Sequence, residues 1–238
     1  MADSGTSAGG QHRMIRRLTV CLVALLAPLT TLVATPVSAQ ASSTVTLRLR
    51  AAARHLPVHR HSHGGRYDRT REFGDWLTQY GECDTRAVVL KQESLKRTTQ
   101  NEYCTVERGK WLSLYDGRYY YNAYGGTVQV DHVVPVKNAW VSGAWRWTKR
   151  TRVRYYNDLG DRRTLVAVDA HDNEAKGDQD PSQWMPSQGR CRYIRYYVAV
   201  KLRWHLSVTR REKRAIRHYA ASCPNRRLRV HTASIRYR

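Results

Sequence analysis

Acidic residues are scarce in this chain. Its 238 residues include 19 Asp and Glu against 41 Lys and Arg, which gives a formal net charge of +22 and a pI near 10.3. The basic residues run along nearly the whole sequence, and Arg far outnumbers Lys. Such a charge favours a polyanionic partner, with nucleic acid first. The alternative is that the charge serves only solubility or attraction to an anionic cell surface.

The sequence also lacks any CxxC pair, which argues against a structural zinc site. One of its five cysteines, Cys21, lies in the first apolar run. The other four form an even set, which in an exported chain predicts two disulfides with three possible pairings. We prefer the sequential pairing because each bond would then close a local loop, which gives Cys83 with Cys104 and Cys191 with Cys223.

A single long apolar run lies close to the N-terminus. It extends from Leu18 to Ala34, follows a basic segment, and leads into small residues suited to cleavage after Ala39. This arrangement predicts a secretory signal peptide over residues 1–39 and therefore a secreted protein. A membrane anchor is the alternative, although an apolar stretch of about 17 residues is at the lower limit for spanning a bilayer. Either Met1 or Met14 can be the initiator.

No internal repeat is present, which argues against a solenoid or a propeller. Residues 40–70 show no useful periodicity and are rich in Arg, His, Ser and Gly, so a flexible basic, His-rich linker is expected there. Its alternating histidines fit an unstructured polar tract better than a metal site. One domain is expected over residues 71–225, followed by a basic tail at 226–238 with no evident fold.

Both strands and helices are expected in that domain. The β-branched content predicts strands at 86–90, 127–130 and 164–168.

Helices are predicted at 138–147, after Pro181, and through the last third of the domain. There, a helical hairpin is expected, and Thr209 and Glu212 have the spacing of a capping box at the start of its second helix. The fold class is therefore α+β.

Three short segments carry side chains suited to phosphodiester chemistry: VDHVVP at 130–135, YYNDLGD at 155–161 and DAHDNEAKGDQDP at 169–181. Hydrolysis of a phosphodiester needs a base that works near neutral pH, which suits histidine, and a cation that neutralises phosphate charge. Successive strand side chains point to opposite faces. Asp131 and His132 can therefore share one site only if the strand ends or bends there, as Pro135 suggests.

Together these segments resemble the HNH, or ββα-metal, nuclease superfamily. Within it they are similar to exported proteins that resemble the C-terminal domain of GmrSD-type restriction endonucleases. The resemblance covers about residues 71–223 and depends on DHVVP being followed by N-x-x-KGDQDP. It implies an α+β fold with a ββα-metal (HNH, or His-Me finger) core and additional helices.

The resemblance also implies residue roles. His132 corresponds to the general base, and Asp131 and Asn173 correspond to the ligands of one divalent metal ion, Mg²⁺ with Mn²⁺ as the alternative. Asn157 corresponds to a group that orients the histidine loop, and Lys176 is expected to face phosphate.

The sequence departs from the family pattern at Glu174, where relatives often have arginine, so one phosphate contact of the family lacks its usual residue. The expected function is that of a secreted, metal-dependent endonuclease that hydrolyses nucleic acid, DNA in preference to RNA. The alternative is a catalytically inactive, secreted basic module that binds surface polyanions.

Overall fold

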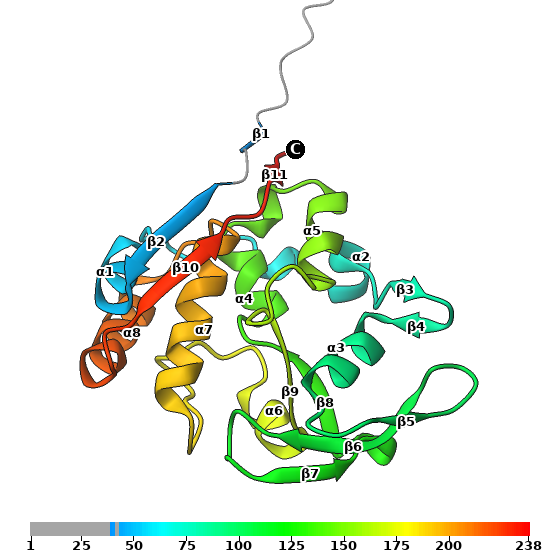
Figure 1. The fold of residues 1–238 in the computed structure, drawn as a ribbon. Coiled ribbons are helices and arrows are strands. Elements are labelled where there is room, and N and C mark those ends of the chain that lie inside the picture. The colour runs from blue at the N-terminus through cyan, green and yellow to red at the C-terminus, as the bar shows by residue number, and fades with distance from the viewer. Residues whose placement is uncertain (1–38, 41–42) are drawn as a thin grey trace, which may run out of the picture. The chain divides into compact units, whose positions relative to one another are not determined.

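The computed structural model describes residues 39–40 and 43–238 (Figure 1). The predicted signal peptide, apart from Ala39, therefore lies outside the described residues. Those that are described belong to one compact unit, Val37–Arg238, which mixes helices and strands as the predicted α+β class requires. Within this described part, the helices are too short or too polar to cross a membrane.

Two antiparallel strands and the helix after them occupy the middle of the unit (Figure 1). β8 (Val128–His132) pairs with β9 (Leu165–Asp169), so the strands predicted at 127–130 and 164–168 are confirmed. Every residue of β9 is buried, in keeping with its continuous apolar run. α6 (Ala170–Lys176) begins directly after β9, and the Asp169 carboxylate caps it by accepting a hydrogen bond from the Asp172 amide.

A three-stranded sheet and a helix pack on one side of this pair. The sheet has the order β5 (Thr99–Gln100), β6 (Val106–Leu112), β7 (Tyr119–Asn122), and the neighbouring elements are β3 (Thr78–Tyr80), β4 (Cys83–Asp84) and α3 (Thr85–Glu93). The predicted strand at 86–90 is wrong because it lies inside α3. Asp84 caps this helix, and its apolar residues face a small core around Trp111. The predicted Cys83–Cys104 disulfide is confirmed.

Helices cover the other side. The predicted helix at 138–147 is two short ones, α4 (Val136–Val141) and the 3₁₀ turn η3 (Ala144–Arg146), separated at Gly143, whose φ of 132° ends the first. α5 (Lys149–Tyr156) follows. The helix expected after Pro181 is wrong, because the Asp180 side chain closes a turn there by accepting hydrogen bonds from the Ser182 amide and hydroxyl.

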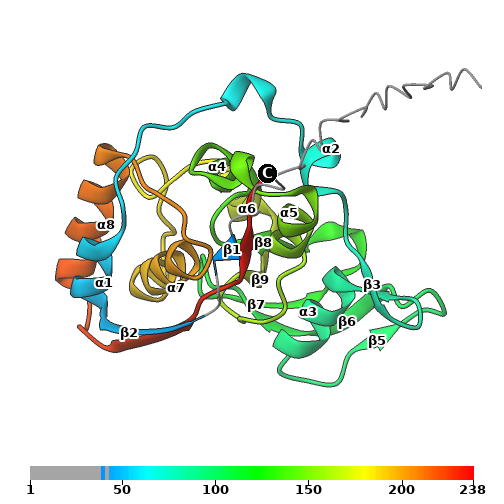
Figure 2. The same cartoon turned by 90° about the horizontal axis from the view of Figure 1, so that it is seen from above.

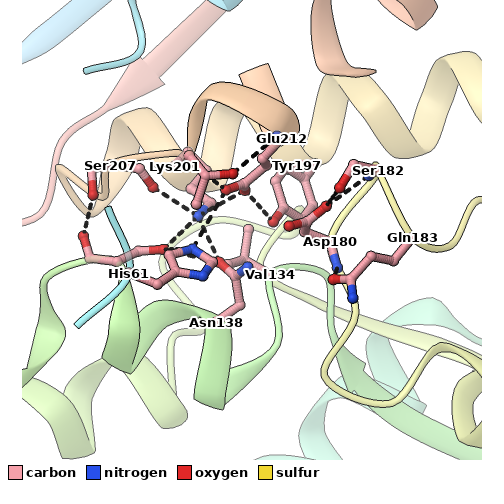
Figure 3. Close-up of polar contacts among 12 residues, drawn as sticks. His61, Val134, Asn138, Asp180, Ser182, Gln183, Tyr197, Lys201, Ser207 and Glu212 are labelled. Carbon is pink, nitrogen blue, oxygen red and sulfur yellow. Dashed lines mark hydrogen bonds and ion pairs between the residues drawn. The ribbon is translucent and has the colours of Figure 1, made fainter. Parts of the chain in front are cut away.

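The predicted helical hairpin is confirmed as α7 (Arg190–Arg203) and α8 (Arg210–Ser222). A Cys191–Cys223 disulfide links the start of one helix to the end of the other, and the capping box of Thr209 and Glu212 is present. A buried ion pair joins the two helices, with Lys201 Nζ 3.0 Å from Glu212 Oε1 (Figure 3). Lys201 also donates to Asn138 Oδ1 at 2.6 Å, which ties the hairpin to α4.

The two ends of the described chain pair with each other. β2 (Thr44–Arg48) pairs with β10 (Arg227–His231), and β1 (Ala39–Gln40) pairs with β11 (Ile235–Arg236). α1 (Leu49–His55) packs against α8 beside the first pair (Figures 1 and 2). Two short helices complete the N-terminal segment, η1 (Gly64–Arg66) and α2 (Arg69–Phe73).

These pairings overturn two expectations. Residues 40–70 are not a flexible linker from Thr44 onward, and residues 226–238 are not an unfolded tail. The physical reason is that Val45 and Leu47 meet Val230 and Leu228 across the β2–β10 ladder, which gives both segments an apolar partner that neither has alone.

Candidate active site

The candidate site lies where β8 ends. Asp131 and His132 are the last two residues of the strand, and the chain then bends through Val134 to Pro135 at the start of α4. Both side chains are largely buried, at 8% and 4% exposure. They contact different elements, as expected for neighbours on a strand.

Asp131 forms a buried ion pair with Lys176 of α6. Lys176 Nζ is 3.0 Å from Oδ1 and 2.9 Å from Oδ2, and the Tyr115 hydroxyl donates a further hydrogen bond to the carboxylate. Burial and the nearby Asp131 charge raise the pKa of Tyr115, which therefore stays a donor. Lys176 also donates to the His132 carbonyl at 3.1 Å and has no exposed surface. It therefore holds the strand end, rather than facing phosphate as expected.

Asn173 lies one helical turn before Lys176 on α6. Its Nδ2 donates to Gln129 Oε1 at 2.7 Å, and Gln129 precedes Asp131 by two residues on β8. The interface between α6 and β8 thus has two parallel contacts, Asn173 with Gln129 and Lys176 with Asp131. The structure brings Asn173 and Asp131 to the same interface without a direct bond between them among the described residues.

The His132 ring is held from two sides. Its Nε2 lies 2.8 Å from the Tyr156 carbonyl oxygen, and the ring stacks on Trp76 with a centroid distance of 5.3 Å and an interplanar angle of 5°. Because a carbonyl can only accept, Nε2 carries the hydrogen and Nδ1 is the basic nitrogen of the neutral ring.

Electrostatics keep this ring neutral. Burial, followed by the charges of Arg69 and Lys176, lowers the pKa of His132 to about 3, against the opposing hydrogen bond to Tyr156. The imidazole is therefore unprotonated near neutral pH, which is the form that a general base needs.

Asn157 connects the two groups that hold the His132 ring. Its amide makes four hydrogen bonds, with Leu77 N (2.8 Å), Thr85 Oγ1 (2.6 Å), Asp75 O (3.1 Å) and Val153 O (3.1 Å). These bonds join the segment that carries Trp76 to the end of α5, where Tyr156 offers its carbonyl. Asn157 thus contacts the supports of His132 and not the ring itself.

A second set of possible metal ligands lies at the start of α6. One side-chain atom each of Asp169, His171 and Asp172 lies within 4.8 Å of the other two. Asp169 is also committed to the helix cap and to a hydrogen bond of 2.8 Å from Ser113 Oγ, and the His171 side chain is 92% exposed. Burial and then the Asp169 charge raise the pKa of Asp172.

Sequence reasoning missed several residues of the site. Gln129 had a usable signal, because it lies two residues before Asp131 and side chains two apart on a strand point to the same face. Tyr115, Trp76 and Arg69 had none, because they reach the site from loops and from a short helix whose placement depends on tertiary packing.

Comparisons with known proteins give the family of the chain. A protein from Arthroderma benhamiae described as an "Uncharacterized secreted protein" is 39% identical over 154 residues, which are 64% of this chain and 74% of that one. No solved structure matches the chain. The secreted relative and the two disulfides fit the predicted location, and the protein is extracellular. Residues 82–219 match the family described as "GmrSD restriction endonucleases, C-terminal domain", and the chain belongs to that family.

Proposed function

We propose that the protein is a secreted, metal-dependent endonuclease that hydrolyses phosphodiester bonds of nucleic acid, with DNA as the preferred substrate. The observation that carries the proposal is His132, a neutral imidazole fixed in one tautomer by the Tyr156 carbonyl, beside Asp131 at a strand end. Membership of a nuclease-like family supports it.

In this mechanism His132 Nδ1 takes the proton of the water that attacks phosphorus. The Tyr156 carbonyl keeps its hydrogen bond to Nε2 and stabilises the ring as it becomes positive. Bound phosphate adds negative charge nearby, which raises the pKa of His132 from its low value and makes the ring a stronger base when substrate is present.

The chemistry of two side chains at the α6–β8 interface suits a hard divalent cation. The Asp131 carboxylate and the Asn173 amide oxygen would hold Mg²⁺ or Mn²⁺, and the ion would neutralise phosphate charge and stabilise the leaving oxygen. Because Asp131 is paired with Lys176, binding of a cation there requires the lysine to give up part of that contact. The set of Asp169, His171 and Asp172 is the second position to test.

The deciding experiment is cleavage of a supercoiled plasmid by the purified mature protein, with Mg²⁺, with Mn²⁺ and with a chelator. We expect metal-dependent cleavage that falls by about 10²–10⁴-fold in His132→Ala. His218→Ala, a change of an exposed histidine on α8, is the matched control and should cleave normally. Full activity in His132→Ala, or none with any divalent ion, would contradict the proposal.

Asn173→Ala and Asp172→Ala distinguish the two metal positions. Loss of metal-dependent cleavage in Asn173→Ala alone places the cation beside Asp131, whereas loss in Asp172→Ala alone places it at the start of α6. Parallel reactions on DNA, RNA and a small phosphodiester define the substrate.

One observation favours a second candidate function, a catalytically inactive basic module that binds polyanions. The Asp131 carboxylate is already neutralised by Lys176 and accepts a hydrogen bond from Tyr115, so the fold satisfies this group without a metal. Such a module would bind DNA with a steep salt dependence, because contacts with phosphate release counterions, and would cleave nothing with any metal. Binding without cleavage would therefore select this function.

A further inference from the structure

A cavity of about 930 Å³ opens beside α2, and His132 is not among its lining residues. The loop before α2, the α4–η3 region and the last two residues of the chain form its walls. This volume lies within the usual range for pockets that take small ligands. Three of its lining residues are aromatic besides His63, namely Trp140, Trp145 and Tyr237.

The aromatic wall is fixed in place. The rings of His63 and Trp145 stack with a centroid distance of 3.6 Å and an interplanar angle of 21°. Trp140 is buried behind them, and its Nε1 donates to the His63 carbonyl at 2.8 Å. A ring pair held in this way offers a flat π surface whose ordering does not depend on a ligand, which suits a planar aromatic partner.

Cationic groups stand at the same cavity. Four arginines and one carboxylate, that of Glu72, line it. Glu72 is already neutralised, since Arg152 Nη2 lies 2.8 Å from it and Arg71 lies 3.1 Å from it. Arg66 and Arg146 have no carboxylate within 4.0 Å in the part of the chain that the structure describes. The cavity can therefore accept an anion together with an aromatic ring.

α2 contributes residues both to this cavity and to the surroundings of His132. Arg69, at the start of α2, donates to the Tyr156 hydroxyl at 2.7 Å on the His132 side, whereas Arg71 and Glu72 line the cavity. Phe73 joins the two regions, because its ring lies 6.3 Å from that of Trp140 and 6.0 Å from that of Tyr155.

We propose that this cavity binds one nucleotide of the substrate strand, with the base against the His63–Trp145 pair and the phosphate on Arg66 and Arg146. The identity of the ligand rests on the proposed nuclease function. Because α2 contacts both regions and His132 does not line the cavity, the cavity is a subsite for a nucleotide that flanks the cleaved bond.

Titration calorimetry with adenosine 5′-monophosphate and the full mature protein tests the proposal. We expect saturable binding, and at least about tenfold weaker binding of both adenosine, which lacks the phosphate, and ribose 5-phosphate, which lacks the base. Trp145→Leu and Arg146→Gln should each weaken nucleotide binding by about tenfold or more. Arg227→Gln, a change of an exposed arginine on β10, is the matched control and should bind within about twofold of the unaltered protein.

Circular dichroism of each variant checks that it is folded. Absence of saturable nucleotide binding by the unaltered protein would overturn the proposal. Tighter binding of a sulfated disaccharide than of the nucleotide, lost in the same variants, would also overturn it and would assign the cavity to a glycan.

His132→Ala keeps this test separate from that of the proposed function. Because His132 does not line the cavity, the variant should bind the nucleotide normally. It should nevertheless fail to cleave plasmid. Nucleotide binding without plasmid cleavage by the unaltered protein would retain the subsite and reject the nuclease. Plasmid cleavage without nucleotide binding would retain the nuclease function and reject the subsite.

Discussion

Lys176 Nζ contacts both carboxylate oxygens of Asp131, at 3.0 and 2.9 Å, where neither side chain is more than 9% exposed. Removal of the ammonium group would leave a buried carboxylate without its counter-charge. We expect Lys176→Met to lower the free energy of unfolding by about 3–5 kcal/mol in urea denaturation. Lys137→Met is the control, because Lys137 pairs with Asp178 at the surface and should contribute about 1 kcal/mol at most. Equal losses of unfolding free energy in Lys176→Met and Lys137→Met would show that burial does not strengthen the Lys176–Asp131 pair.

The buried His132 ring makes stability depend on pH. The ordinary pKa of a histidine side chain is 6.5, whereas that of His132 in the folded protein is about 3, so between these values the unfolded chain binds the extra proton. The stability from this residue is fully present above pH 6.5 and is lost as the pH falls toward 3. Between pH 7.5 and 4.5 we expect it to decrease by roughly 2–3 kcal/mol.

Urea denaturation at the two pH values, with a chelator present, measures this effect. His132→Gln should lack that part of the pH dependence, whereas His218→Gln, with an exposed histidine replaced, should retain it. The same pH dependence in His132→Gln as in the unaltered protein would refute the assignment.

Asn157 is expected to position His132 through Trp76 and the end of α5. Asn157→Ala would leave the Leu77 amide without its acceptor and the Thr85 hydroxyl with only the more distant Leu77 carbonyl, and should destabilise the fold by about 1–3 kcal/mol. If the protein cleaves DNA, kcat should fall by about ten- to a hundredfold with little change in KM.

Asn225→Ala separates the two effects. Asn225 accepts a hydrogen bond from the Arg50 amide at 3.0 Å, away from His132, so its loss should lower stability without lowering kcat. Asn157→Asp keeps the acceptor oxygen and should recover part of the activity. An unchanged kcat in Asn157→Ala would leave Asn157 with a purely structural role.

The Cys191–Cys223 disulfide closes the α7–α8 hairpin across 32 residues of sequence. Loop-closure entropy for a loop of this length predicts that the double change Cys191→Ala, Cys223→Ala lowers the free energy of unfolding by about 3–4 kcal/mol. Thermal unfolding of this variant, in which the Cys83–Cys104 bond stays intact, measures the loss relative to the unaltered protein. A loss below about 1 kcal/mol would mean that packing of α7 on α8 suffices without the bond.

Local chemistry made part of the fold predictable. β8, β9 and the capping box at Thr209 follow from short sequence signals, and the structure contains them together with the preferred sequential disulfide pairing. The strand predicted at 86–90 is wrong because the Asp84 cap begins a helix there, which the β-branched residues alone do not indicate.

The partners of the candidate site residues could not be predicted in the same way. Asp131 and Lys176 are 45 residues apart in sequence, and their contact depends on how α6 lies along β8. The support of His132 by Trp76 and the Tyr156 carbonyl likewise depends on packing between α2 and α5. A motif identifies such residues, whereas the packing of elements distant in sequence decides which of their atoms come into contact.

The β2–β10 ladder determines when folding can finish. Thr44 contacts His231 across 187 residues, and closing so long a loop is slow because its entropy is lost before the contacts form. The chain is made from its N-terminus, so β2 has no partner strand until β10 has been added. The apolar side chains of β2 therefore wait for their cross-strand partners, Leu228 and Val230, until β10 has been made.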